Sequence, residues 1–185
     1  MESNNISEEI LNRCRTGDKE AFRVVVQRYQ RMLFSLAARL LCNEDDAKDV
    51  VQETFIKVWL NINHYDDRQN FRTWIYTIAT RLCIDRLRQR SWEAPMPDEE
   101  EYFAQYVAED KTDLPLENHQ LLSILHTLVA KLSNKQRIVF TLIYLENLTT
   151  EEVTRLTGLD AAKIKSNLYV ARRTIQEQLK RLGYE

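Results

Sequence analysis

The sequence has 185 residues and a formal net charge of -2, with 44% hydrophobic and 29% charged residues. This composition is typical of a folded globular protein rather than a disordered one, and the length suits one medium domain or two small ones. Only three glycines and three prolines occur. Because a sheet of several strands needs such residues in its turns, we expect an all-α fold.

The sequence shows no sign of membrane insertion, secretion or disulfide bonding. No run approaches the roughly 18 apolar residues of a membrane span, and the first residues are acids and amides instead of the basic and apolar stretch of a signal peptide. Cys14, Cys42 and Cys83 lie far apart, whereas disulfides and zinc sites need closer or paired spacing. We expect three small buried side chains and a cytoplasmic protein.

Helical periodicity runs almost without a break through the N-terminal part. Asp18 is a suitable N-cap, and after it apolar residues recur at intervals of three and four as far as Leu40. A second helix is predicted from Asp46 to Leu60. After a polar stretch over residues 61–70, a third helix runs from Phe71 to about Arg90.

The second of these helices carries a row of polar side chains opposite its apolar side: Asp46, Asp49, Gln52 and Glu53. With Asp45, this row is the only candidate for a carboxylate metal site. A helical di-metal site needs Glu-x-x-His motifs on facing helices, and neither these nor a catalytic motif occurs. We expect no catalysis, cofactor or metal. The row is interpreted as a docking surface for a basic partner, and a solvated helix face is the alternative.

The third helix is strongly basic. Six arginines lie between Arg68 and Arg90, with Asp85 as the one acid. Arginines interleaved with aromatic and hydroxyl residues suit contact with a nucleic-acid backbone and stacking on unpaired bases. Trp74 fits this surface and the edge of the buried side equally well. The outward side is expected to include Thr73, Tyr76, Thr77, Thr80 and Arg88.

Residues 91–118 differ in composition from the rest of the chain. They hold nine acidic residues, a single lysine and all three prolines. An acidic segment marked by prolines between two helical blocks is typical of a linker.

The C-terminal part has the pattern of a helix-turn-helix. Capping boxes of Ser133 with Gln136 and of Thr149 with Glu152 predict helices to about residues 145 and 156. Gly158 is suited to end the second of these helices, and Asp160 to cap the last one. A short helix, a glycine turn and a longer basic helix are typical of this motif.

The last helix carries six basic residues between Lys163 and Arg181, with Glu177 as the one acid. A helix with such donors fits the major groove, where side chains contact base edges and phosphates. A solvated basic helix packed on its own domain is the alternative interpretation.

Three stretches in this order resemble the bacterial RNA polymerase sigma factors of the extracytoplasmic-function (ECF) group. Residues 46–59 resemble the polymerase-docking helix of that family and residues 71–88 its promoter-melting helix. The C-terminal helix-turn-helix of the family is similar to residues 133–140, 150–153 and 164–172 of this chain. The resemblance implies a docking and minus-ten melting domain over 1–90, an acidic linker over 91–118, and a helix-turn-helix domain that binds the minus-thirty-five element over 119–185.

The resemblance also implies the function and the partners. Such a protein binds core RNA polymerase, recognises the minus-thirty-five and minus-ten elements of promoter DNA, and helps open the DNA without catalysis of its own. Such factors are often held by an anti-sigma factor, and they are not inserted in the membrane. The alternative is a stand-alone helix-turn-helix transcriptional regulator that binds DNA without polymerase.

The resemblance assigns residues to three surfaces. Docking on polymerase is implied for Asp46, Asp49, Gln52 and Glu53. The polar stretch 61–70 is implied to hold a flipped minus-ten base, and the minus-ten residues are Asn63, His64, Tyr65, Arg68, Arg72, Trp74, Tyr76, Thr77, Thr80, Arg81 and Arg88. The minus-thirty-five residues are Lys163, Lys165, Ser166, Asn167, Tyr169, Arg172 and Arg173.

The sequence departs from the family pattern at a few positions. Such helices usually have Ala-Arg-Asn where this chain has Ala79, Thr80 and Arg81, and the difference concerns base preference in the minus-ten element. Asn167 and Val170 stand where arginines are common. The contact with the minus-thirty-five element is therefore expected to depend on the other basic and polar residues of the last helix.

Overall fold

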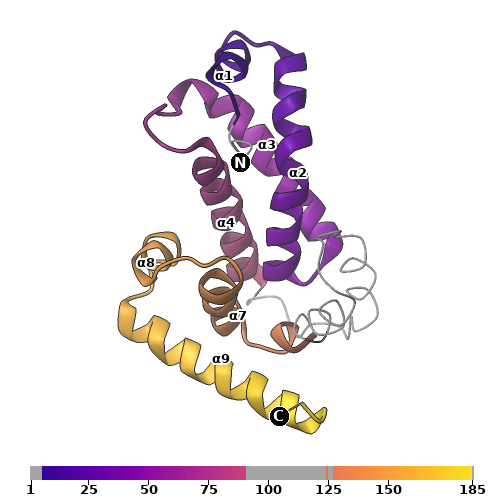
Figure 1. The fold of residues 1–185 in the computed structure, drawn as a ribbon, viewed down its shortest axis with the longest axis vertical. Coiled ribbons are helices and arrows are strands. Elements are labelled where there is room, and N and C mark those ends of the chain that lie inside the picture. The colour runs from indigo at the N-terminus through magenta and orange to yellow at the C-terminus, as the bar shows by residue number, and fades with distance from the viewer. Residues whose placement is uncertain (1–5, 91–123, 125–126, 185) are drawn as a thin grey trace. The chain divides into compact units, whose positions relative to one another are not determined.

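The computed structural model describes residues 6–90, 124 and 127–184, and every regular element in these ranges is a helix (Figure 1). The predicted all-α fold is therefore confirmed. The chain divides into two compact units, Met1–Arg86 and Leu87–Glu185. The acidic linker predicted over residues 91–118 lies outside the described residues.

The first unit is built from four α-helices and one short 3-10 helix. These are α1 (Glu8–Arg15), α2 (Lys19–Leu41), α3 (Glu44–Asn61), η1 (Ile62–His64) and α4 (Phe71–Arg90), the last of which runs past the division between the units. The long helices α2 and α3 pack against each other. The core of the unit includes the buried apolar residues that the periodicity predicted on α2, among them Val25, Leu33, Leu36 and Leu40.

The ends of α2 are set by local contacts. Asp18 caps its start, as predicted, because Oδ1 of the carboxylate accepts from the backbone N–H groups of Glu20 and Ala21 at 2.9 and 3.1 Å. At its end Cys42 takes the left-handed conformation, with φ 50°, and its N–H donates to the carbonyl of Ala38. All three cysteines are buried, which confirms the expectation of three small buried side chains.

Helix α1 was not predicted, because the periodicity is recognisable only after Asp18. The hydroxyl of Ser7 accepts from the N–H of Ile10 at 3.4 Å and caps the helix, and the acids of the first turn, Glu8 and Glu9, suit the positive end of the helix dipole. Leu11 and Cys14 are buried. Two buried residues in eight are a short periodic signal, and packing against α2 stabilises the helix.

The second unit contains α7 (Asn134–Phe140), the π-helical turn η2 (Thr141–Leu145), α8 (Thr150–Thr157) and α9 (Ala161–Arg181). Residues 127–130 are also helical. Both α7 and α8 pack against α9. The buried apolar residues of the unit include one cluster: Leu128, Val129, Leu132, Phe140, Ala171 and Ile175.

The helix predicted from Ser133 to about Leu145 is α-helical only as far as Phe140. Over its last five residues the winding widens, and the N–H of Glu146 donates to the carbonyl of Thr141, five residues earlier, at 3.0 Å. The capping box at its start is present, with the side chain of Gln136 accepting from the N–H of Ser133 at 3.3 Å.

Candidate nucleic-acid interface

Helix α8 and the turn between α8 and α9 are determined by local hydrogen bonds. At the start of α8, the carboxylate of Glu152 accepts from the N–H of Thr149 at 2.8 Å, and the hydroxyl of Thr149 accepts in return at 3.3 Å. The donation from the Thr149 backbone holds the pKa of Glu152 below its usual value. This confirms the second predicted capping box.

At the other end of α8, Gly158 adopts φ 71° and its N–H donates to the carbonyl of Thr154 at 2.9 Å. Asp160 then caps α9, because its Oδ1 accepts from the N–H of Lys163 at 2.7 Å. The same donation holds the pKa of Asp160 below its usual value. The predicted helix-turn-helix geometry is therefore present: a short helix, a left-handed glycine and a capped long helix.

The face of α9 opposite the core is exposed. Its exposed residues include Ala162, Lys163, Ser166, Tyr169, Val170 and Arg173. Lys165 and Arg172 are exposed too, and neither forms an ion pair within the described residues.

Three polar residues of α9 are engaged in contacts of their own. Lys163 pairs with Asp160 at 3.0 Å and Arg173 with Glu177 at 2.8 Å. Asn167 is half-buried, and its side-chain amide donates to the carbonyl of Lys163 one turn earlier at 2.8 Å. Asn167 is therefore the least available member of the set assigned to the minus-thirty-five element.

The acidic row on α3 divides into an inward and an outward part. The side chain of Asp46 is only 15% exposed, and its Oδ1 accepts from the guanidinium of Arg86 on α4 at 3.1 Å. Asp49 is 64% exposed and lies 3.8 Å from the same guanidinium. Gln52 is exposed, and Glu53 pairs with Lys57 at 3.5 Å. Asp46 therefore ties α3 to α4, and the outward part begins at Asp49.

Two large apolar side chains extend this outward part, and the sequence analysis did not single them out. Ile56 is 51% exposed and Leu60 is 69% exposed. They follow Glu53 at intervals of three and seven, which places them on the same side of the helix. We call the residues Asp49, Gln52, Glu53, Ile56 and Leu60 the α3 stripe. The sequence signal for the α3 stripe is the presence of Ile56 and Leu60 on the polar side of a helix whose other side is already apolar.

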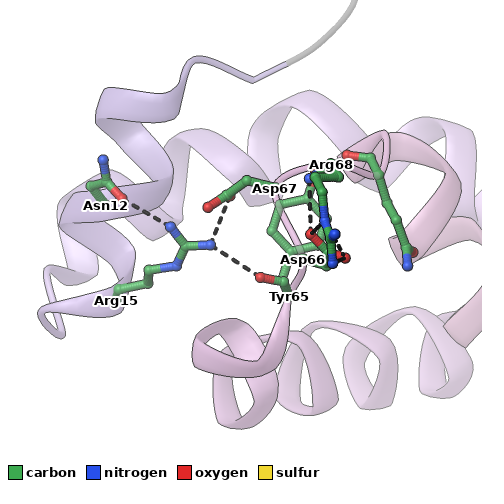
Figure 2. A network of polar contacts seen from close by, with 7 residues as sticks. Asn12, Arg15, Tyr65, Asp66, Asp67 and Arg68 are labelled. Atoms are coloured by element: carbon green, nitrogen blue, oxygen red, sulfur yellow. Dashed lines mark hydrogen bonds and ion pairs between the residues drawn. The ribbon is translucent and has the colours of Figure 1, made fainter.

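The polar stretch between α3 and α4 forms a loop that α1 supports (Figure 2). Arg15 Nη2 donates to the carbonyl of Tyr65 at 3.2 Å and to the carboxylate of Asp67 at 2.7 Å. Arg15 Nη1 donates to Asn12 Oδ1 at 2.9 Å. The hydrogen bond to Asp67 raises the pKa of Arg15.

Within the loop, Arg68 folds back on Asp66. The guanidinium makes a two-pronged contact with the carboxylate, at 3.0 Å from Nε and 2.9 Å from Nη2, and the N–H of Arg68 donates to the same group. This pairing with Arg68 holds the pKa of Asp66 below its usual value. The N–H of Gln69 closes the turn by donating to the carbonyl of Asp66 at 2.9 Å. The charge of Arg68, assigned to minus-ten DNA, is largely balanced inside the loop.

Tyr65 anchors the loop in the core and is a buried residue. Its ring lies edge-on to Phe71 at 5.2 Å between centroids and 5.1 Å from Trp74, and its hydroxyl donates to the carbonyl of Gln69. Burial raises the pKa of Tyr65. Trp74 is half-buried and also packs on Phe71, at 5.6 Å, so it lies at the edge of the core with part of its surface accessible.

The remaining residues assigned to the minus-ten element differ in accessibility. Asn63, His64, Arg72 and Arg81 are exposed, and Tyr76 and Thr77 are partly exposed. Thr80 was expected on the outward side of the helix, but it is buried, and its hydroxyl donates to the carbonyl of Tyr76 at 2.9 Å. Arg88 lies in the last turns of α4, beyond the division between the units. Tyr65 and Thr80 are therefore removed from the candidate DNA surface.

Comparison with known proteins decides the family. The family model for Sigma-70 region 2 matches residues 25–93, and the family model for Sigma-70, region 4 matches residues 122–175. The ECF RNA polymerase sigma-E factor of Haemophilus influenzae is 30% identical over 182 residues, which cover 94% of this chain and 95% of the relative. The chain belongs to the ECF RNA polymerase sigma factors. It therefore acts in promoter recognition at the initiation of transcription.

The chain is also similar to a further relative and, in its fold, to a solved structure. The ECF RNA polymerase sigma factor SigW of Bacillus subtilis is 29% identical over 181 residues, covering 93% of this chain and 96% of the relative. The sigma factor RpoE from Bartonella quintana, in a co-crystal structure with the anti-sigma factor NepR, shares the fold with a TM-score of 0.59. It is 23% identical, over 86% of this chain and 96% of that one. Helix α1 lies before the matched region 2, which begins at residue 25.

None of the helices that the structure describes is long and apolar enough to cross a membrane. Within the same residues, no group of three or more His, Cys, Asp and Glu side chains is placed to hold a metal ion.

Proposed function

We propose that this ECF sigma factor binds core RNA polymerase through the α3 stripe, contacts the minus-thirty-five element with α9, and helps open the minus-ten element with the 65–70 loop and α4. The protein performs no catalysis; the free energy of binding is used to deform DNA, since unstacking one base step costs a few kcal/mol. It acts in the cytoplasm, where core polymerase and the chromosome lie. We extend to it the class of partner seen with the Bartonella relative, an anti-sigma factor.

The observation that carries this proposal is the composition of the α3 stripe. Exposed carboxylates at Asp49 and Glu53 continue directly into exposed apolar side chains at Ile56 and Leu60. Apolar residues beside a charged rim are typical of a protein–protein interface. A helix face that only meets water has no need of two large apolar residues on one side.

The exposed face of α9 supports the DNA-binding part of the proposal. Lys165 and Arg172 present charges that no described residue balances, and Ser166 and Tyr169 lie between them on the exposed surface. Such cations bind phosphates, and the hydroxyl groups supply hydrogen bonds to base edges. A stand-alone regulator would share this feature, so it is the α3 stripe that separates the two functions.

The minus-ten surface that we propose is smaller than the one assigned from the sequence. It comprises exposed and partly exposed residues around the loop and along the part of α4 in the first unit: Asn63, His64, Arg68, Arg72, Trp74, Tyr76, Thr77 and Arg81. Aromatic and arginine side chains on such a surface suit stacking on unpaired bases.

The test is capture of core RNA polymerase by the wild-type protein and by a double variant, Asp49→Lys with Glu53→Lys. Asp46 is left in place because its carboxylate holds Arg86. We expect the wild type to retain core polymerase and the variant to lose it by about tenfold or more, since like charges brought together across an interface cost several kcal/mol. The matched control is Glu9→Lys with Glu20→Lys, which makes the same change in charge at two exposed acids of α1 and α2.

The wild type and the two double variants together separate the possible outcomes. Loss by the α3 variant alone supports docking through the α3 stripe, and retention by all three moves the interface elsewhere on the sigma factor. A folded wild type that fails to retain core polymerase contradicts the proposal. Binding of DNA without polymerase would then favour the stand-alone regulator, which usually binds two half-sites as a dimer.

A further inference from the structure

Arg15 joins α1 to the loop between α3 and α4 by contacts that bridge a long stretch of sequence. Its guanidinium donates to the carbonyl of Tyr65, 50 residues away, and to the carboxylate of Asp67, 52 residues away. Figure 2 shows the guanidinium pointing from α1 into the loop, with Asn12 on its other side. One planar donor group therefore fixes a backbone atom and a side chain of the same loop.

The loop has few other attachments to the rest of the first unit. The ring of Tyr65 packs in the core, whereas Asp67, Arg68, Gln69 and Asn70 are exposed. The contact between Arg68 and Asp66 lies within the loop, so it does not hold the loop to its surroundings. The side chain of Arg15 is only 23% exposed and that of Asp67 is 52% exposed, so the hydrogen bond from Arg15 to the Tyr65 carbonyl is the partly buried one of the two. A partly buried charged hydrogen bond is stronger than one fully in water.

We infer that Arg15 is a positioning residue, which holds the 65–70 loop in the conformation that accepts an unpaired base of the opened minus-ten element. This inference rests on the proposed function of the loop. The positioning comes from a segment that precedes the region 2 match, which begins at residue 25. The guanidinium of Arg15 is turned toward Tyr65 and Asp67, so Arg15 acts through the loop and does not itself contact DNA.

Loss of Arg15 is expected to affect one step of initiation. Without its guanidinium, the carbonyl of Tyr65 and the carboxylate of Asp67 return to water, and the loop samples other conformations. The apparent affinity for single-stranded minus-ten DNA falls in proportion to the fraction of molecules whose loop keeps the binding conformation. Hydrogen bonds to charged groups contribute enough to change that fraction about tenfold.

The first measurement is amide hydrogen exchange on the free full-length protein. The N–H of Tyr65 donates to the carbonyl of Ile62 and that of Gln69 to the carbonyl of Asp66, so these two amides report on the loop. In Arg15→Ala they are expected to exchange about tenfold faster, while the amides of α9 are unchanged. The matched control is Arg13→Ala. Arg13 lies on the same helix, carries the same charge and pairs with Asp18 at 2.8 Å, not with the loop.

The second measurement uses the assembled holoenzyme. The probe is the pool of forked DNA that the wild-type holoenzyme retains from a library with a randomised single-stranded segment. Arg15→Ala is expected to lose about tenfold in affinity for this pool, while affinities for core polymerase and for the duplex part alone stay within about twofold. A merely structural defect would lower all three affinities together, because it removes folded protein.

A conservative variant tests the bridging geometry. Arg15→Lys keeps the charge beside Asp67 but has no planar fork to reach two acceptors, so both measurements should fall between those of wild type and Arg15→Ala. The inference is overturned if loop exchange in Arg15→Ala equals that in Arg13→Ala. It is equally overturned if exchange rises but affinity for the forked pool does not fall. Failure of the wild type to bind core polymerase would instead contradict the proposed function, and the exchange data would still decide whether Arg15 holds the loop.

Discussion

The turn between α8 and α9 and the loop between α3 and α4 are held by different kinds of contact. In the turn, the N–H of Gly158 donates to the carbonyl of Thr154, four residues earlier, and the side chain of Asp160 accepts from the N–H of Lys163, three residues later. In the loop, the bonds from Arg15 join residues 50 and 52 apart. A few neighbouring residues therefore determine the turn, whereas the loop takes its conformation only when α1, α3 and α4 are in place.

The two regions also differ in how their basic residues are balanced. Lys165 and Arg172 on α9 have no ion pair within the described residues, while Arg15 and Arg68 at the loop are both paired with aspartates. Unpaired cations suit sequence-independent attraction to DNA phosphates. Paired cations instead stabilise the conformation of the loop whose aspartates they bind. The unpaired cations Lys165 and Arg172 therefore suit attraction to DNA, whereas the paired arginines at the loop stabilise its conformation.

The largest expected effect comes from removing the aromatic support of the loop. Phe71 is fully buried and packs on Tyr65 at 5.2 Å, Tyr29 at 5.7 Å and Trp74 at 5.6 Å. Phe71→Ala should lower the free energy of unfolding of the first unit by about 3–5 kcal/mol, because it leaves a cavity in the core. Urea unfolding followed by amide hydrogen exchange measures this unit by unit.

The reciprocal variant is Phe140→Ala, which removes a buried ring from the core of the second unit. It should speed exchange in α7 and α9 and leave the loop amides unaffected, while Phe71→Ala should do the reverse. Equal destabilisation of both regions by either variant would contradict the comparison, since it would mean that the two regions unfold together.

A smaller effect is expected at the glycine of the turn. Gly158 has φ 71°, and a Cβ added there would meet nothing within 4 Å, so the cost of Gly158→Ala comes from the backbone alone. A left-handed conformation costs a non-glycine residue about 1–2 kcal/mol, and urea unfolding of the second unit should show this loss. Gly17, with φ 85° and equally open space, is the matched site in the first unit.

An asparagine series sharpens this prediction. Asparagine tolerates the left-handed region better than alanine does, so Gly158→Asn should cost less than Gly158→Ala. If the two variants unfold at the same urea concentration, the backbone conformation does not account for the choice of glycine in the turn.

The same contrast explains what could be predicted from the sequence. Asp18, the capping boxes, Gly158 and Asp160 act over two to four residues, and the sequence shows such signals directly. The inward turn of Asp46 toward Arg86, 40 residues away, depends on how α3 meets α4, and no local pattern indicates it. For the same reason Tyr65 was assigned to DNA although it is buried.

Helix α1 and the π-helical turn mark a second limit. Eight residues with two buried positions give too short a periodic signal to distinguish α1 from a coil. The widening at Thr141 leaves the apolar pattern of the segment nearly unchanged, so it is visible only in the hydrogen bond from Glu146 to Thr141. Contacts made in the folded unit, rather than residue type, determine both features.

The smallest effect concerns acid, and it should involve both units through their carboxylate caps. Backbone N–H donors hold the pKa values of Asp18 and Asp160 below the usual value, which is about 3.9 for an unfolded chain. A lowered pKa means that the charged form favours the folded state. The stabilisation is therefore fully present above about pH 4 and is lost as the pH falls through the lower pKa of the folded protein.

Asp160→Asn keeps an oxygen that can cap α9 but does not titrate. Urea unfolding at pH 7 and pH 3 should show a smaller acid-induced loss in the second unit for this variant than for the wild type, with the first unit still losing the contribution of Asp18. An identical loss in the second unit of both proteins would mean that the cap at Asp160 contributes nothing to its pH dependence.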